Sequence, residues 1–295
     1  MEIEYSDGLS RDEWLALIDV RRNPFYRYPA DPNVLVWRYV NFAKFVSLLD
    51  SSSLFFPRAS LFDDSFEGSV SRVNVEQRQQ RNIEGIERLS KHSNLTNIPN
   101  WETSTIAQLQ AHDATMSTHL EWQRNWTFIS CWHVNPHESA AMWKLYGMHQ
   151  EAVAVVSTFK RLKDALTPHI VPPSGEPKLG LVHYADYEYE PIEQMVHLSE
   201  YFFKRKSFEH ESELRAVIQD LPLKPIPNYH GFHYDISAIP FAGKSLTISL
   251  TTLIQEVRVA PAAPDWFYCL VENVIRKYGL NCPVIRSHLD NDPIY

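Results

Sequence analysis

The chain has 295 residues, of which 44% are hydrophobic and 13% aromatic, enough apolar material for one large folded domain or two small ones. This composition excludes a disordered protein, because a chain with so many apolar residues folds to bury them away from water. The formal net charge of −8 excludes a protein that is basic as a whole, and leaves only a local basic groove for binding nucleic acid.

The first predicted elements are an N-terminal helical extension within residues 1–33 and a strand over 34–40 that is rich in β-branched and aromatic residues. Asn41 ends this strand and is expected to cap a helix, because apolar residues recur after it at helical spacing. A second strand and a turn follow over 53–68. The sequence therefore predicts a strand that leads directly into a helix.

Residues 71–124 are rich in Gln, Arg, Glu, Asn and Ser and have thin apolar periodicity, which indicates surface helices inserted between core elements. We expect this helical insertion to be peripheral and mobile, as a lid or a specificity segment. The pattern after it predicts a strand, a helix and a strand, over 126–132, 137–148 and 151–157.

A further strand is expected within 179–187, and apolar residues at helical spacing predict a helix from Ile192 to Phe203. That helix leads to a strand over 211–218, and the chain is expected to end in a strand, a helix and a strand within 255–289. Together these elements predict one mixed α+β domain spanning 1–295.

The strand FEHESELRAVIQ carries the main candidate site. Alternation places Glu211, Glu213 and Arg215 on one face and apolar residues on the other. Two carboxylates on one face can divide the work of a reaction, since one can stabilise positive charge while the other orients or deprotonates a nucleophile. Crowding should raise the pKa of one of them. The alternative is a solvated acidic face on which Arg215 pairs with Glu213.

Two other strands carry candidate ligand-binding residues. Arg38, between Trp37 and Tyr39, suits a phosphate or carboxylate ligand, although an edge-strand arginine that reaches water would look the same. Ser130 lies on one strand face with Trp132, and its alternative is a satisfied core serine.

Basic residues and possible metal ligands do not decide the function. The cations at 204–206 could hold an anionic substrate or a nucleic acid strand, or they could end a helix in solvent. His133, His137 and His149 lack any metal-site spacing, so we expect no metal. Three widely spaced cysteines lack a CxxC pattern, and the first residues lack a signal-peptide core, so we expect a cytoplasmic protein with no membrane partner.

Four segments resemble, in order, the prokaryotic domain of unknown function 2971, a family without an established activity. The match runs from about residue 35 to 219. The segments are VWRYVNFAKFVSLLDSSSLFFPRASLFDDSFEG, FISCWHVNPHESAAMWKLYG, EAVAVVS and FEHESELRAVI.

An arginine on an early strand, a serine within an aromatic strand and Glu-x-Glu on a later strand are also similar to the Arg–Ser–Glu pattern of ADP-ribosyltransferases. Where those enzymes typically have Ser-Thr-Ser, this chain has SCW at 130–132. This resemblance implies a split mixed β-sheet around a central cleft with peripheral helices. It also implies that NAD is the co-substrate.

Carried over by position, the resemblance implies that Arg38 grips the phosphates or ribose of NAD, with Tyr39 and Trp132 beside it. Ser130 would support the nicotinamide ribose. It further implies two catalytic carboxylates: Glu213 would hydrogen-bond the ribose and stabilise the oxocarbenium-like transition state, and Glu211 would orient the acceptor.

The resemblance thus implies an NAD-dependent ADP-ribosyltransferase acting on a protein or nucleic-acid acceptor, in a toxin or phage-defence setting. One alternative is a metal-dependent nuclease that uses Glu211, Glu213 and Lys206 around Mg²⁺. Another is a non-catalytic binding protein.

Overall fold

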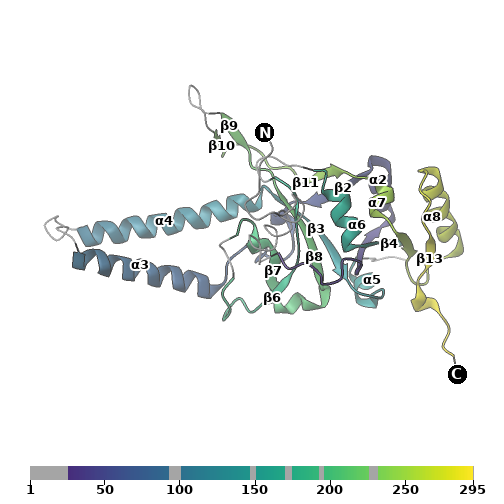
Figure 1. Cartoon of the computed structure of the whole chain (residues 1–295), viewed down its shortest axis with the longest axis horizontal. Coiled ribbons are helices and arrows are strands. Elements are labelled where there is room, and N and C mark those ends of the chain that lie inside the picture. Colours follow the sequence, from purple (N-terminus) through teal and green to yellow (C-terminus); the bar gives the residue numbers. More distant parts are fainter. Residues whose placement is uncertain are drawn as a thin grey trace, which may run out of the picture.

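The computed structural model describes residues 26–92, 101–146, 151–169, 175–192, 196–225 and 232–294. Most of the expected N-terminal extension lies outside this part of the chain. The described residues form a mixed α+β fold around one large sheet (Figure 1), which confirms the α+β part of the predicted fold class. The split of the sheet around a central cleft stays a prediction. Among the described residues, no helix has both the length and the apolar character that crossing a membrane requires.

The large sheet has seven strands in the described part of the chain, in the order β13-β12-β4-β1-β3-β8-β5. Neighbouring strands are antiparallel except β12 and β13, which are parallel. The strands are β1 (Leu35–Asn41), β3 (Thr127–Val134), β4 (Ala152–Thr158), β5 (Lys178–Leu181), β8 (Glu213–Gln219), β12 (Glu256–Val259) and β13 (Val284–Arg286).

Smaller strand pairs flank this sheet: β2 with β11, β6 with β7, and β9 with β10. Their bounds are β2 (Ser53–Pro57), β6 (His183–Ala185), β7 (Phe203–Arg205), β9 (Leu223–Pro225), β10 (Phe232–Tyr234) and β11 (Gly243–Thr247). The α-helices are α2 (Phe42–Ser51), α3 (Arg72–His92), α4 (Trp101–Arg124), α5 (Ala140–Tyr146), α6 (Phe159–Leu166), α7 (Leu250–Leu253) and α8 (Asp265–Lys277). The short 3-10 helices are η1 (Ala59–Leu61), η3 (Ser199–Phe202), η4 (Lys206–Glu211) and η5 (His288–Asp290).

The predicted transition from β1 into α2 is confirmed at Asn41. Its side-chain oxygen accepts a hydrogen bond of 2.9 Å from the backbone N–H of Lys44, which satisfies one of the free donors at the start of the helix. Phe45 and Leu49, one turn apart, are buried against the sheet. The cap and the apolar spacing together place α2 on one face of the sheet.

Strand register divides the central sheet into two faces with different chemistry. In the pairing of β3 with β8, Ser130 is opposite Ala216 and Cys131 is opposite Arg215, so these two pairs point to opposite faces. The first face, with Ala216, is covered by α2, α6, α7 and α8 in the main apolar core. The second face, with Arg215, is covered by α5 and by the η1 and η3 segments. The charged residues of β8 lie on this second face.

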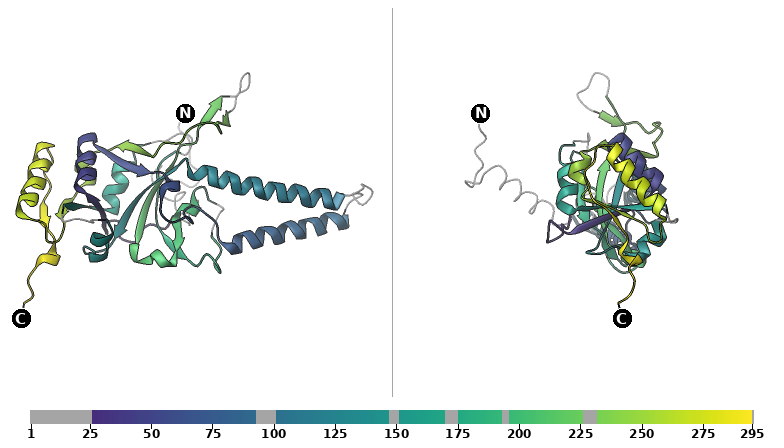
Figure 2. Two further views of the ribbon diagram at one scale, coloured as in Figure 1. Left: turned by 180° about the vertical axis from the view of Figure 1, so that it is seen from behind. Right: turned by 90° about the vertical axis from the view of Figure 1, so that its right-hand side faces the viewer.

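The predicted helical insertion is confirmed as a hairpin of α3 and α4, which contact each other and project away from the sheet (Figures 1 and 2). Both helices are poor in apolar residues, so neither could bury a wide face. Its peripheral position agrees with the prediction, and its mobility stays a prediction.

Two predicted elements differ from the structure. The helix expected from Ile192 to Phe203 is wrong in its described part, because Leu198 has a left-handed φ of 65° and only the short η3 follows before β7. The apolar residues there pack against the sheet without a helix. The strand expected from residue 211 begins only at Glu213, because Ser212 has a φ of 41° and ends η4.

Candidate active site

Five charged side chains meet on the second face of the sheet, and we refer to them as the charge cluster. Their side chains are each at most 11% exposed, which is unusual for ionisable groups. They come from the turn after η1, from β7, from η4 and from β8. The members are Glu67, Lys204, Glu211, Glu213 and Arg215.

Arg215 is the centre of the cluster and is fully buried in β8. Both of its terminal nitrogens donate to the carboxylate of Glu67, at 3.0 Å for Nη2, and Nη1 also donates to the Tyr201 carbonyl at 2.6 Å. Its Nε donates to Oε2 of Glu213 at 2.7 Å. Such planar pairing suits a guanidinium and fixes both carboxylates in place.

The turn that carries Glu67 depends on Gly68. Gly68 has a φ of 69°, and a Cβ atom there would lie 2.3 Å from the ring of Tyr201. A left-handed backbone that also touches an aromatic ring can be occupied only by glycine without strain. Asp64 begins the same turn by accepting a hydrogen bond of 3.0 Å from the Phe66 N–H. The sequence DDSFEG thereby brings Glu67 to Arg215.

Lys204 joins the two glutamates of the Glu-x-Glu motif. Its ammonium donates to Oε1 of Glu213 at 2.7 Å and also to Glu211. Glu211 lies in η4 and Glu213 begins β8, so the expectation that they share one strand face is wrong. The turn at Ser212 nevertheless brings both carboxylates to the same lysine.

The charges of the cluster do not balance, since three carboxylates share two cations. Burial raises the pKa of Glu211 to about 7, and the neighbouring Glu213 raises it further than Lys204 lowers it. Burial would also raise the pKa of Glu213, but Arg215 and Lys204 together hold it well below the usual range. Near neutral pH, Glu213 is therefore ionised and Glu211 exchanges its proton.

The side of the cluster at Glu211 is the one nearest to solvent. The Tyr146 hydroxyl, at the end of α5, hydrogen-bonds to Glu211, while the Tyr146 ring is half exposed. His133 holds the backbone of Glu211, with its Nδ1 2.6 Å from the Glu211 carbonyl, and burial lowers the pKa of this imidazole. The neutral ring therefore donates from Nδ1.

The predicted NAD-binding residues do not join this cluster. Arg38 donates to Ser130 Oγ at 2.8 Å and to the Phe55 carbonyl at 2.8 Å, and Trp132 Nε1 donates to the same serine oxygen at 3.1 Å. Arg38, Ser130 and Trp132 are thus together, as expected, but on the first face. Tyr39 lies on the second face, where its hydroxyl accepts from the Ser139 N–H at 2.9 Å.

The expectation of one cleft that contains Arg38, Ser130, Glu211 and Glu213 is therefore wrong. Trp37 is paired with His133, and His133 is paired with Glu213, so Trp37 shares the face of Glu213 and the next residue, Arg38, points the other way. The physical reason is that side chains alternate between the two faces along a strand. Arg38 and Glu213 therefore lie on opposite faces of the sheet, and no loop conformation can change this.

Of the three residues expected for a nuclease, Glu211 and Glu213 lie together but Lys206 does not join them. Lys206 pairs with Glu190 at an exposed position, and the lysine that contacts both Glu211 and Glu213 is Lys204. Within the described ranges, no group of three or more His, Cys, Asp or Glu side chains is arranged to hold a metal ion.

Sequence reasoning missed Glu67, Tyr146 and the role of Lys204. One signal was available, because DDSFEG is an acidic turn with a glycine between two apolar segments. The sequence left Lys204 either in an anion-binding basic run or in a solvated helix end, and its burial and its contacts with both glutamates show that it points inward. The alternative of a solvated acidic face is wrong: Arg215 does pair with Glu213, but both side chains are buried.

In comparisons with known proteins, no family model, curated protein or solved structure matches this chain. The charge cluster thus has to be interpreted from its own geometry.

Proposed function

We propose that the protein is an NAD-dependent ADP-ribosyltransferase whose catalytic carboxylates are Glu213 and Glu211 of the charge cluster. We also propose that the sheet has the arrangement of ADP-ribosyltransferases and that the protein uses NAD in the cytoplasm. The observation that supports it is that one lysine contacts two carboxylates whose pKa values are shifted in opposite directions. Such divergence is typical of carboxylate pairs that divide acid–base and electrostatic work.

In the proposed reaction, the bond between C1′ of the ribose and the ring nitrogen of nicotinamide breaks, and its electron pair leaves with nicotinamide. The leaving group becomes neutral, since the ring nitrogen of NAD carries the positive charge. The ribose becomes oxocarbenium-like, and the ionised carboxylate of Glu213 stabilises this charge through a ribose hydroxyl. As the acceptor bonds to C1′, Glu211 takes the proton from the acceptor.

Lys204 and Arg215 have a positioning role in this proposal. They keep Glu213 ionised and hold both of its oxygens by hydrogen bonds. Glu211 and the Cys131 thiol also hydrogen-bond to Glu213, whose side chain is only 5% exposed, so a ribose hydroxyl would have to replace one of these donors. Glu211 is the one that stops donating when it loses its proton. Arg38 and Ser130 have no part in it, because they point to the first face.

The proposal is tested by incubating the purified protein and cell extract with labelled NAD, and by following both nicotinamide release and labelled macromolecules by mass spectrometry. Glu213→Gln should lower nicotinamide release about a hundredfold or more. Glu211→Gln should spare slow hydrolysis and impair transfer. Glu209→Gln is the matched control, since Glu209 lies on the same 3-10 helix but is exposed.

Wild-type protein that releases no nicotinamide in any extract would overturn the proposal. Equal rates for Glu213→Gln and Glu209→Gln would also overturn it, and would favour a binding protein whose charge cluster only holds the fold together.

A further inference from the structure

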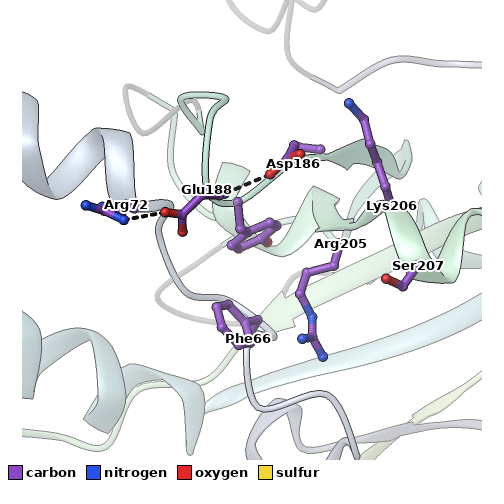
Figure 3. Close-up of a pocket in the computed structure, with 9 residues that line it drawn as sticks. Phe66, Arg72, Asp186, Glu188, Arg205, Lys206 and Ser207 are labelled. Carbon is purple, nitrogen blue, oxygen red and sulfur yellow. Dashed lines mark hydrogen bonds and ion pairs between the residues drawn. The ribbon is translucent and has the colours of Figure 1, made fainter.

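A pocket with a volume of about 360 Å³ is lined by residues of the segments that also carry Glu67 and Lys204. Figure 3 shows the side chains that line it. Its size is in the range of sites for small-molecule ligands. The wall contains three cations and two aromatic rings, together with the carboxylates of Asp186 and Glu188. The cations and rings are Arg72, Arg205, Lys206, Phe66 and Tyr187.

The pocket and the charge cluster share two stretches of chain. Arg205 lines the pocket, while the preceding Lys204 contacts Glu211 and Glu213. Phe66 lines the pocket, while the following Glu67 binds Arg215. The pocket wall and the charge cluster are therefore built from the same two chain segments.

Arg205 is held rigidly at the pocket wall. Its Nη2 donates to Asp64 at 2.7 Å, and its guanidinium lies over the ring of Phe66 at 4.4 Å and near the ring of Phe208 at 5.5 Å. Two aromatic contacts and one buried carboxylate fix the direction of the remaining N–H groups. An arginine fixed in this way is preorganised for an oxyanion.

Two buried donors at this wall lack an acceptor within the described chain. They are the hydroxyl of Tyr187, a residue 7% exposed, and the Nε of Arg205. Burial, and then the negative charge of Glu67, raise the pKa of Tyr187, so its hydroxyl keeps its proton and can donate. Because a buried donor without a partner costs about 1–3 kcal/mol, such atoms indicate a ligand that supplies acceptors.

The other two cations are free to change partners. Arg72 pairs with Glu188 and also with Glu76 one turn along α3, and Lys206 pairs with Glu190, with all five side chains more than one third exposed. Exposed ion pairs are worth little, so a phosphate could replace any of these carboxylates at small cost. Arg72 and Lys206 could thus close on an anion that Arg205 has positioned.

We propose that this pocket binds the diphosphate of an ADP-ribosyl group, with phosphate oxygens accepting hydrogen bonds from Arg205 Nε and the Tyr187 hydroxyl. The inference rests on the proposed function for the identity of the ligand. It assigns the diphosphate to the pocket whose Tyr187 lies near Glu67 and Arg215 of the cluster, instead of to Arg38.

The test is isothermal titration of the full chain with ADP-ribose, with adenosine and with citrate, so that a phosphate, an uncharged nucleoside and a carboxylate are compared. We expect binding of ADP-ribose that is at least tenfold tighter than binding of either of the others. Tyr187→Phe should weaken ADP-ribose binding about fivefold without lowering the melting temperature, since the hydroxyl it removes has no partner in the described chain. Arg205→Gln should weaken binding at least tenfold.

Arg286→Gln is the control, because Arg286 pairs with the exposed Asp265 elsewhere on the molecule. If ADP-ribose binds equally well to wild type, Tyr187→Phe and Arg205→Gln, or binds no better than citrate, the pocket assignment is wrong even if the protein turns over NAD. If ADP-ribose binding depends on the pocket but nicotinamide is never released, the assignment stands and the proposed function fails.

Discussion

Glu211 and Glu213 differ in ionisation because of their immediate neighbours. Glu213 receives hydrogen bonds from Arg215 and from Lys204, whereas Glu211 receives one from Lys204, lies beside Tyr146 and, when protonated, itself donates to Glu213. With three carboxylates for two cations, the glutamate with the fewest donors holds the extra proton. The sequence predicts that crowding raises the pKa of one glutamate of the pair, and this agrees with Glu211. Which glutamate it is could not be predicted from Glu-x-Glu alone, since Glu67 joins the cluster from 146 residues before Glu213.

The raised pKa of Glu211 has a consequence for stability. In the folded protein the pKa of Glu211 is about 7, against 4.5 for the unperturbed group. The folded state therefore binds this proton more tightly than the unfolded state, and the stability that it contributes is present below pH 4.5 and is lost as the pH rises to 7. Glu211→Gln mimics the protonated form and does not titrate. Relative to wild type, this variant should gain about 1–3 kcal/mol of unfolding free energy between pH 5 and pH 8.

Urea unfolding at both pH values measures this difference, with Glu209→Gln as the exposed control. If the stability difference between Glu211→Gln and wild type is the same at pH 5 and pH 8, the pKa of Glu211 is not raised.

Arg215 should be the residue on which the cluster depends most for stability. Arg215→Met would leave Glu67 and Glu213 buried without their main cation, which should lower the unfolding free energy by about 3–5 kcal/mol. Arg286→Met removes an exposed pair and should cost about 1 kcal/mol or less. Chemical denaturation of the two variants makes the comparison, and a similar small loss for both would mean that the cluster is hydrated and not buried.

At the level of elements, the turn between η1 and α3 positions Glu67. Gly68→Ala combines a left-handed φ of 69° with a contact to the ring of Tyr201, and it should destabilise the protein by about 2 kcal/mol or more. At Gly85, in the middle of α3, an added Cβ atom would meet no other atom within 4 Å, so Gly85→Ala should stabilise by about 0.5–1 kcal/mol. Thermal melts of the two variants should shift in opposite directions, and a harmless Gly68→Ala would contradict the described turn.

The hairpin of α3 and α4 projects from the sheet and buries few apolar residues, so its amides should exchange with solvent faster than those of β3. Hydrogen–deuterium exchange followed by mass spectrometry compares peptides from 101–124 with peptides from 127–134. Equal protection would show that the hairpin unfolds only with the sheet and would remove the lid interpretation.

Local patterns predicted most elements of the sheet but not how they face one another. The β1–α2 transition, the hairpin and the strand–helix–strand at the end of the chain follow from capping, composition and apolar spacing. Two features could not be predicted. One is the strand register that places Arg38 and Glu213 on opposite faces of the sheet, and the other is that the Lys204 side chain points inward. The register is set by pairing between segments far apart in the chain, and the direction of Lys204 depends on the pairing of β7 with β6.

For the whole molecule, the central claim is that the charge cluster on the second face cleaves NAD. The most direct measurement is the rate of nicotinamide release from NAD by Glu213→Gln and Glu209→Gln, each shown to be folded by its melting temperature. The account predicts that Glu213→Gln binds NAD nearly as well as wild type but releases nicotinamide at least about a hundredfold more slowly, while Glu209→Gln matches wild type. A folded Glu213→Gln variant with the wild-type rate would contradict it.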